Sequence, residues 1–125
     1  FEATVAGHKL KLDASPEFGG KNYGPIPKPL LLVSLAGCTG LDVISILQKM
    51  RVPVAYFNVK VEAEVSETDP KVYTAITIIY EIDAGVPLAK VEKAVTLSQE
   101  EYCGVSAMLR KACPVTYRIE QKQNV

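Results

Sequence analysis

The segment Leu30–Met50 constrains the fold of this chain more than any other feature. It contains no proline, and on a helical wheel at about 100° per residue most of its polar side chains collect on one narrow stripe. Most of the remaining circumference is Leu, Val, Ile, Ala or Met, a pattern typical of a helix buried on nearly every side. Asp42 interrupts the apolar run, so we interpret the segment as a core helix and not as a membrane span. The stripe comprises Ser34, Cys38, Asp42, Ser45 and Lys49.

Cys38 is the most informative residue of this stripe. A thiol that shares a stripe with a carboxylate and an amine meets polar groups without leaving the core, which favours thiol chemistry. The alternative, a small buried apolar residue, is equally open at this point. Gly37 and Gly40 leave room beside the sulfur for a ligand or for another backbone. A lowered thiol pKa would need a nearby cation, for which the candidates are His8, Lys28, Arg51, Arg110 and Arg118.

Length and composition limit the class of protein. The 125 residues predict one domain over 1–125, and nearly half of them are apolar, which excludes a disordered chain. The 14 basic and 14 acidic residues balance, so there is no basic surface for nucleic acid. Three widely spaced cysteines predict free thiols in a reducing compartment, the cytoplasm, rather than a secreted disulfide framework. The start of the chain resembles no signal peptide, and no membrane partner is expected.

Periodicity and turn residues predict an α+β fold, because strands and helices segregate along the chain. A helix that is apolar on nearly every side needs more cover than one small sheet provides, so we expect a homodimer. The expected elements are a hairpin over 1–13 with its turn at Gly7-His8, a loop over 14–27, the helix to about Arg51, antiparallel strands over 57–66 and 72–82, a helix from Pro87, a short helix after Gly104, and a strand over 115–120.

The remaining candidate residues have weaker signals. Cys103 precedes a predicted helix start, which favours the thiolate, although a space-filling role is equally open. Asp42 is expected to orient a neighbouring group, because a buried carboxylate needs a partner. Cys113 has the pattern of a packing residue and His8 that of an exposed turn residue. Ser98 and Glu101 have capping-box spacing, which predicts a new helical turn at Ser98, and Leu88, Val91, Val95 and Ser98 are the predicted buried face of the helix before it.

Two long cysteine motifs resemble the OsmC-like family. They are Gly24–Leu32 followed by Leu35–Val43, and the later segment Leu97–Leu109. The resemblance implies an intertwined α+β homodimer with antiparallel sheets wrapped around two central helices. It also implies that the family's first strand is partly missing ahead of Phe1.

In peroxidase members of that family, a first cysteine attacks a hydroperoxide and a second resolves it as a disulfide. By resemblance these roles belong to Cys38 and Cys103, with an external dithiol as reductant and no cofactor or metal. Hydroperoxide-resistance members also carry a glutamate before the long helix and a partner arginine. Here the segment Pro27-Lys28-Pro29 has no acid, so the chain resembles the less characterised branch, with Asp42, Lys28 and His8 as supporting candidates.

Two functions are open at the level of sequence. The first is a two-cysteine peroxidase that reduces organic hydroperoxides in oxidative-stress defence. The second is a non-catalytic protein that binds a small apolar or thiol-bearing ligand in the dimer cleft. No metal site is expected, because the sequence has no closely spaced pair of Cys or His ligands.

Overall fold

The computed structural model describes residues 1–123 and has the α+β class predicted from the sequence. Two compact units divide the chain: the first is Phe1–Val33, and the second begins at Ser34. The prediction of a single domain over 1–125 stays a prediction. Within residues 1–123 there are two β-sheets of two and three strands, in the orders β1-β2 and β3-β4-β5.

The N-terminal unit contains the predicted hairpin. Strands β1 (Glu2–Val5) and β2 (His8–Lys11) pair antiparallel, with Val5 opposite His8. The turn is Ala6-Gly7, one residue earlier than predicted, and both residues have positive φ angles of 48° and 82°. Two-residue hairpin turns of this kind need positive φ, which glycine adopts without strain. His8 therefore opens β2 instead of lying in the turn, and a short 3-10 helix, η1 (Pro16–Phe18), follows in the predicted loop.

Helix α1 (Leu30–Lys49) is the long helix predicted from the sequence. Pro29 immediately precedes it, where a missing N–H costs no helical hydrogen bond. By length and composition alone α1 could cross a membrane, but one stripe of it is fully buried inside the protein. That stripe is Leu35, Thr39, Val43 and Leu47, at intervals of one helical turn.

Within the single chain α1 is buried on one side only, so the prediction that it is buried on nearly every side depends on the expected second copy. Leu41, on the side of α1 away from the buried stripe, is 75% exposed. Gly40 does lie against the sheet, because a Cβ there would be 3.3 Å from a methyl group of Val59. Its role is therefore close packing of helix on strand, whereas a Cβ on Gly37 would meet open space.

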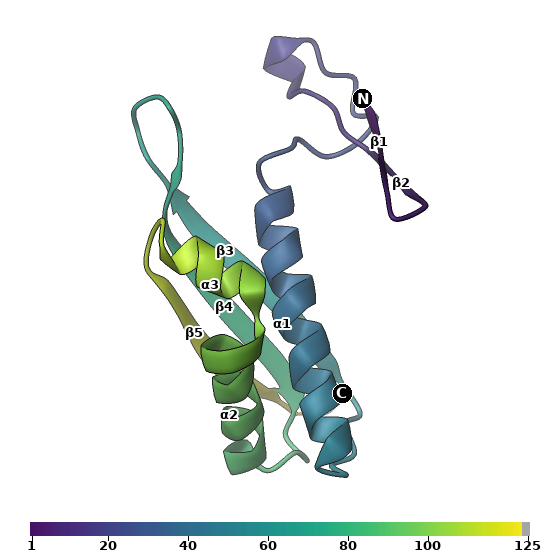
Figure 1. Ribbon diagram of the computed structural model, residues 1–125, viewed down its shortest axis with the longest axis vertical. Helices are drawn as coiled ribbons and strands as arrows, with labels where there is room; N and C mark the ends of the chain where they lie inside the picture. Colours follow the sequence, from purple (N-terminus) through teal and green to yellow (C-terminus); the bar gives the residue numbers. More distant parts are fainter. Residues whose placement is uncertain (124–125) are drawn as a thin grey trace. The chain divides into compact units, whose positions relative to one another are not determined.

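The second sheet is mixed. Strands β3 (Phe57–Val65) and β4 (Tyr73–Asp83) pair antiparallel as predicted, while β5 (Val115–Lys122) runs parallel to β4. This pairing differs from the all-antiparallel expectation because the helical segment between β4 and β5 carries the chain back to the other end of the sheet. Figure 1 shows α1 and this helical segment on the same face of the sheet.

The crossover consists of α2 (Leu88–Leu97), a π-helical turn η2 (Ser98–Tyr102) and α3 (Gly104–Arg110). A new turn, η2, does begin at Ser98 as predicted, but the predicted capping box is wrong, because Ser98 has helical φ and ψ angles of −60° and −50° and the helix continues through it. Leu88, predicted on the buried face of α2, is exposed at the start of the helix. Val91, Val95 and Ser98 are buried as predicted.

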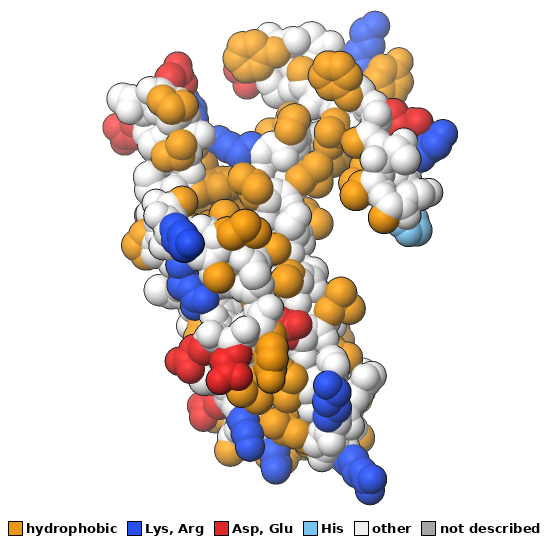
Figure 2. Space-filling model, in the orientation of Figure 1, with side chains coloured by type: hydrophobic (Ala, Val, Ile, Leu, Met, Phe, Trp, Pro, Cys, Tyr) orange, Lys and Arg blue, Asp and Glu red, His pale blue; other side chains and the backbone are white. Residues whose placement is uncertain are grey.

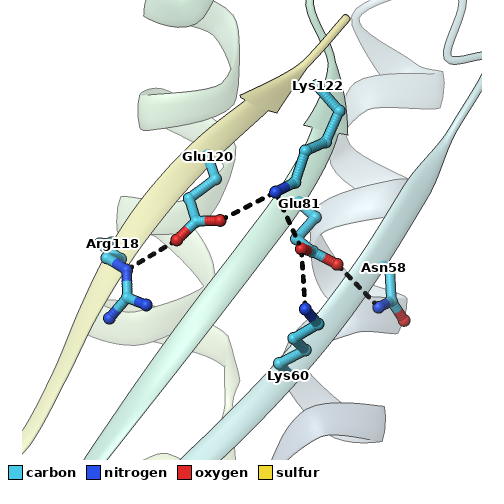
Figure 3. Close-up of polar contacts among 6 residues, drawn as sticks. All are labelled: Asn58, Lys60, Glu81, Arg118, Glu120 and Lys122. Carbon is cyan, nitrogen blue, oxygen red and sulfur yellow. Dashed lines mark hydrogen bonds and ion pairs between the residues drawn. The ribbon is translucent and has the colours of Figure 1, made fainter. Parts of the chain in front are cut away.

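Adjacent residues of β4 point to opposite faces of the sheet. Tyr80 points toward the helices, whereas Glu81 points to the open face, where Figure 3 shows an ionic network. Glu81 contacts the amines of Lys60 at 3.1 Å and Lys122 at 3.2 Å. The full network comprises Asn58, Lys60, Glu81, Arg118, Glu120 and Lys122.

Candidate functional site

The fold brings two of the three cysteines together beside a carboxylate. The Sγ atoms of Cys38 and Cys103 and a carboxylate oxygen of Asp42 all lie within 4.8 Å of one another. Cys38 and Asp42 are one turn apart on α1, and Cys103 is the residue that caps α3. The resolving role that the resemblance implies for Cys103 requires the two thiols to lie close together, and they do so within one chain. Cys113, buried after α3, is not a member of this cluster.

Cys103 is held in a fixed position. Its side chain is the N-cap of α3, where Sγ accepts a hydrogen bond from the backbone N–H of Ser106 at 3.4 Å. Burial raises the pKa of the Cys103 thiol to about 11, and the neighbouring Cys38 and Asp42 act in the same direction. The expectation that the helix start favours the thiolate is therefore wrong, because desolvation outweighs the hydrogen bond from Ser106.

Asp42 has the hydrogen-bonding partner that a carboxylate at this position was expected to need. Its Oδ2 accepts a hydrogen bond from Ser98 Oγ at 2.9 Å. The carboxylate is half-buried and borders an open groove of about 480 Å³. The other residues lining this groove are Ser45, Ile46, Lys49, Leu97 and Tyr102.

A chain of hydroxyl groups leads from the sheet to Asp42. Thr39 Oγ1 lies 2.6 Å from Tyr80 Oη and 2.8 Å from Ser98 Oγ. A carboxylate only accepts hydrogen bonds, so Ser98 donates its single hydroxyl proton to Asp42. Ser98 must therefore accept a hydrogen bond from Thr39. Thr39 in turn accepts from Tyr80, which fixes one direction for the whole chain. Burial raises the pKa of Tyr80 to about 12, so its proton stays available for this bond.

Gln99 joins this chain to Cys103. Its Nε2 donates to Thr39 Oγ1 at 3.1 Å and to Tyr80 Oη at 3.0 Å. Its Oε1 accepts from Ser106 Oγ at 2.6 Å, and the Ser106 N–H reaches the Cys103 sulfur. We call Thr39, Tyr80, Ser98, Gln99 and Ser106 the neutral network. All five are buried, so each depends on the others for its hydrogen bonds.

Sequence reasoning missed all five members of the neutral network as site residues, although it placed Ser98 on a buried helix face. On the helical wheel Thr39 lies within the apolar face of α1, and Tyr80 lies within the apolar strand β4. A hydrogen-bonding side chain at a position whose periodicity demands burial needs a buried partner. That mismatch was the available signal for Thr39 and Tyr80.

The cationic side chains predicted to activate Cys38 lie in different parts of the structure. Arg118 pairs with Glu120 at 2.8 Å on the open face of the sheet, away from the thiols. Arg110 donates to the backbone carbonyl of Gln99, next to the neutral network. Lys28 and His8 belong to the N-terminal unit rather than to the unit that carries the thiols, so their supporting role stays a prediction. Arg51 follows the end of α1, with a positive φ of 58°.

Comparison with known proteins gives one consistent family. The model of the family described as OsmC-like protein matches residues 19–118. Protein YhfA of Escherichia coli strain K12 is 38% identical over 119 residues, which is 94% of this chain and 85% of YhfA.

Solved structures share the fold. The OsmC-like protein of Mycoplasma pneumoniae matches with a TM-score of 0.80 at 16% identity, over 96% of this chain and 86% of that one. A protein of Legionella pneumophila described as an organic hydroperoxide resistance protein matches with a TM-score of 0.69 at 19% identity, over 90% and 82% of the two chains. The family match covers both thiols of the cluster, and the chain belongs to the OsmC-like family.

Proposed function

We propose that this protein reduces organic hydroperoxides with a pair of cysteines. The observation that carries the proposal is the juxtaposition of the Cys38 and Cys103 sulfurs within 4.8 Å. Proteins of this fold include some described as organic hydroperoxide resistance proteins, which suggests a role in redox or stress defence. The two-cysteine mechanism is our proposal for this chain.

The two environments divide the roles between the thiols. Cys38 is half-buried and reachable from outside, whereas Cys103 is 3% exposed and its pKa is raised to about 11. A protonated, buried thiol is a poor first nucleophile. Cys38 is therefore the residue that reacts with the oxidant, and Cys103 is the neighbouring thiol that reacts second.

The proposed reaction has three steps. The Cys38 thiolate attacks the terminal oxygen of the hydroperoxide, the O–O bond breaks, and an alcohol leaves after taking up a proton. The Cys103 sulfur then attacks the Cys38 sulfenic acid, and the Cys103 proton leaves with the displaced hydroxyl as water. An external dithiol reduces the resulting disulfide. The sulfurs must approach to about 2.05 Å in the disulfide, a small movement from their present positions.

The groove beside Asp42 favours organic over inorganic peroxides. Ile46, Leu97 and Tyr102 give it apolar walls. Each CH₂ group that a substrate buries there contributes about 0.8 kcal/mol to binding. Cumene hydroperoxide should therefore react faster than hydrogen peroxide.

Single-turnover kinetics with three variants test the mechanism. Cys38→Ser should abolish peroxide consumption, and Cys103→Ser should accumulate a sulfenic acid that dimedone traps and that then over-oxidises. Cys113→Ser is the matched control and should behave as wild type, since Cys113 lies outside the cluster. Peroxide turnover by Cys38→Ser would show that the assignment is wrong.

The second candidate is a protein that binds a small ligand without catalysis. The open groove of about 480 Å³ beside Asp42 is the observation that favours it. Counting free thiols before and after one equivalent of cumene hydroperoxide separates the two functions. Loss of two thiols per chain supports the peroxidase, and an unchanged count selects the binding protein.

We also propose that the protein is a cytoplasmic homodimer. The exposed apolar side chains of α1, which include Leu31, Val33 and Leu41, support a second copy as cover. Figure 2 shows hydrophobic side chains along the visible face of this helix. An obligate dimer interface of this kind buries on the order of 2,000 Å² or more. Sedimentation at low micromolar concentration should show no folded monomer.

A further inference from the structure

We propose that the reduced site binds one Zn²⁺ ion through Cys38 Sγ, Cys103 Sγ and a carboxylate oxygen of Asp42, and that the bound ion closes the site to oxidants. The first half of this inference requires reduced thiols but not peroxide turnover. The second half rests on the proposed function. No metal site was expected from the sequence, because the ligands come together only in the folded chain.

The spacing of the three donor atoms fits a small tetrahedral ion. In such a site zinc–sulfur bonds of about 2.3 Å place two sulfurs about 3.8 Å apart. The three donor atoms already lie within 4.8 Å of one another, so rotamer adjustments bring them to bonding distance. Cys38 and Asp42 are separated by one helical turn, which puts both donors on the same side of α1.

The groups behind the donors are already in place. Metal ligands are usually held by a second layer of hydrogen bonds, which fixes their orientation. Ser98 Oγ donates to Asp42 Oδ2 at 2.9 Å, which leaves Oδ1 for an ion. The Ser106 N–H holds the Cys103 sulfur at 3.4 Å. Two of the three ligands are thus oriented before any ion arrives.

The donor set selects the kind of ion. Two thiolates and one carboxylate favour Zn²⁺ over the oxygen-seeking Mg²⁺ and Ca²⁺. Three protein ligands leave one position for water, and the groove beside Asp42 gives that water an approach. Binding replaces the two thiol protons, which pass to the buffer, and no atom changes oxidation state. The sulfur electron pairs that would attack a peroxide are then engaged with the metal.

Cobalt(II) is the probe for the site, because it replaces Zn²⁺ and its thiolate complexes absorb light. Titration of the fully reduced chain should give one equivalent of sulfur-to-cobalt charge-transfer absorption, with the visible bands of a tetrahedral ion, and Zn²⁺ should remove both. Cys113→Ser should give the same spectrum as wild type. Cys38→Ser and Cys103→Ser should each lose most of the charge-transfer band, and Asp42→Asn should weaken binding about 10-fold or more.

Two results would overturn the inference: no stoichiometric cobalt spectrum in the reduced wild type, or a spectrum that Cys103→Ser leaves unchanged. Asp42→Asn retains an acceptor for Ser98, so weaker binding by this variant, with a wild-type circular dichroism spectrum, reports the lost ligand and not a lost fold. A second readout is alkylation of Cys38 by iodoacetamide, which Zn²⁺ should slow. Metal binding without any reaction with hydroperoxide would refute the proposed function and support the zinc site. Reaction with hydroperoxide without metal binding would support the proposed function and refute the zinc site.

Discussion

Two polar networks lie on opposite faces of the same sheet, and they begin at adjacent residues of β4. Tyr80 belongs to the neutral network under the helices, and Glu81 belongs to the ionic network on the open face (Figure 3). The neutral network is wholly buried, whereas the lysines that meet Glu81 are 58% and 37% exposed. Hydrogen bonds in the first are shielded from water, while charges in the second are screened by it.

This difference shows where each kind of interaction is useful. The neutral network connects Asp42 to Cys103 and therefore fixes the geometry of the candidate site. It has no formal charge of its own, so it avoids the cost of burying unpaired ions. The ionic network lies across three strands on the open face of the sheet. Substitutions in the two networks should therefore differ in size and in their dependence on salt.

Thr39→Val should have the largest effect on stability. The substitution keeps the shape but removes the hydroxyl that contacts Tyr80, Ser98 and Gln99. Each buried polar group left without a partner costs about 1–3 kcal/mol, so we expect a total loss of about 2–4 kcal/mol. Urea unfolding measures this loss, which should not depend on salt.

Thr77→Val is the matched control for this substitution. Thr77 lies on the open face of β4, and its hydroxyl is 3.5 Å from that of Thr116. The change in stability should stay within about 0.5 kcal/mol. Equal losses of stability in Thr39→Val and Thr77→Val would show that hydroxyl groups on the two faces of the sheet contribute equally.

Glu81→Gln should have a smaller effect that depends on pH and salt. Asn58 and the two lysines lower the pKa of Glu81 from 4.5 to about 2. A lowered pKa in the folded state stabilises the protein above the unfolded value, and this stabilisation is lost as the pH falls through the folded value. The difference in free energy of unfolding between wild type and variant should have its maximum value above about pH 5 and should decrease toward pH 2.

Urea unfolding across this pH range, at low salt and at about 0.5 M NaCl, measures the effect of Glu81→Gln. Salt should reduce the difference because the partner lysines are exposed to solvent. A difference that was constant from pH 7 to pH 2 would show that Glu81 acts through packing instead of charge.

Arg118→Gln should have the smallest effect. Its partner Glu120 is also paired with Lys122, and both Arg118 and Glu120 are partly exposed. Exposed ion pairs of this kind contribute little to stability. We expect an unfolding midpoint equal to that of wild type within error. A loss as large as that of Glu81→Gln would mean that the ionic network acts as one cooperative unit.

The periodicity of the sequence was sufficient to predict the main helices and strands. The long apolar run predicted α1, and alternating residues predicted β3 and its antiparallel partner. Turn position was less certain, since Gly7 could lie in either half of a two-residue turn and the structure places it second. The parallel pairing of β5 depends on the path of the crossover, which no local pattern encodes.

Only part of the candidate site could be predicted from the sequence, for a similar reason. Cys38 and Asp42 share a helix face, so their spacing was enough to associate them. Most hydrogen bonds of the neutral network join residues that are 19 to 60 positions apart, such as Tyr80 with Gln99 and Thr39 with Gln99. Burial of Cys103 is also a tertiary property, and it reversed the prediction that the helix start would favour its thiolate.

The capping of α3 has a consequence for how the state of this protein could be observed. The same sulfur atom of Cys103 starts a helix and belongs to the reactive cluster. Any bond that this sulfur forms, to carbon, sulfur or metal, changes its strength as an acceptor for the Ser106 N–H. The amide resonance of one backbone position is thus an internal indicator of the thiol's chemical state. It would work in the intact protein, with no extrinsic probe attached to the thiol and no substrate.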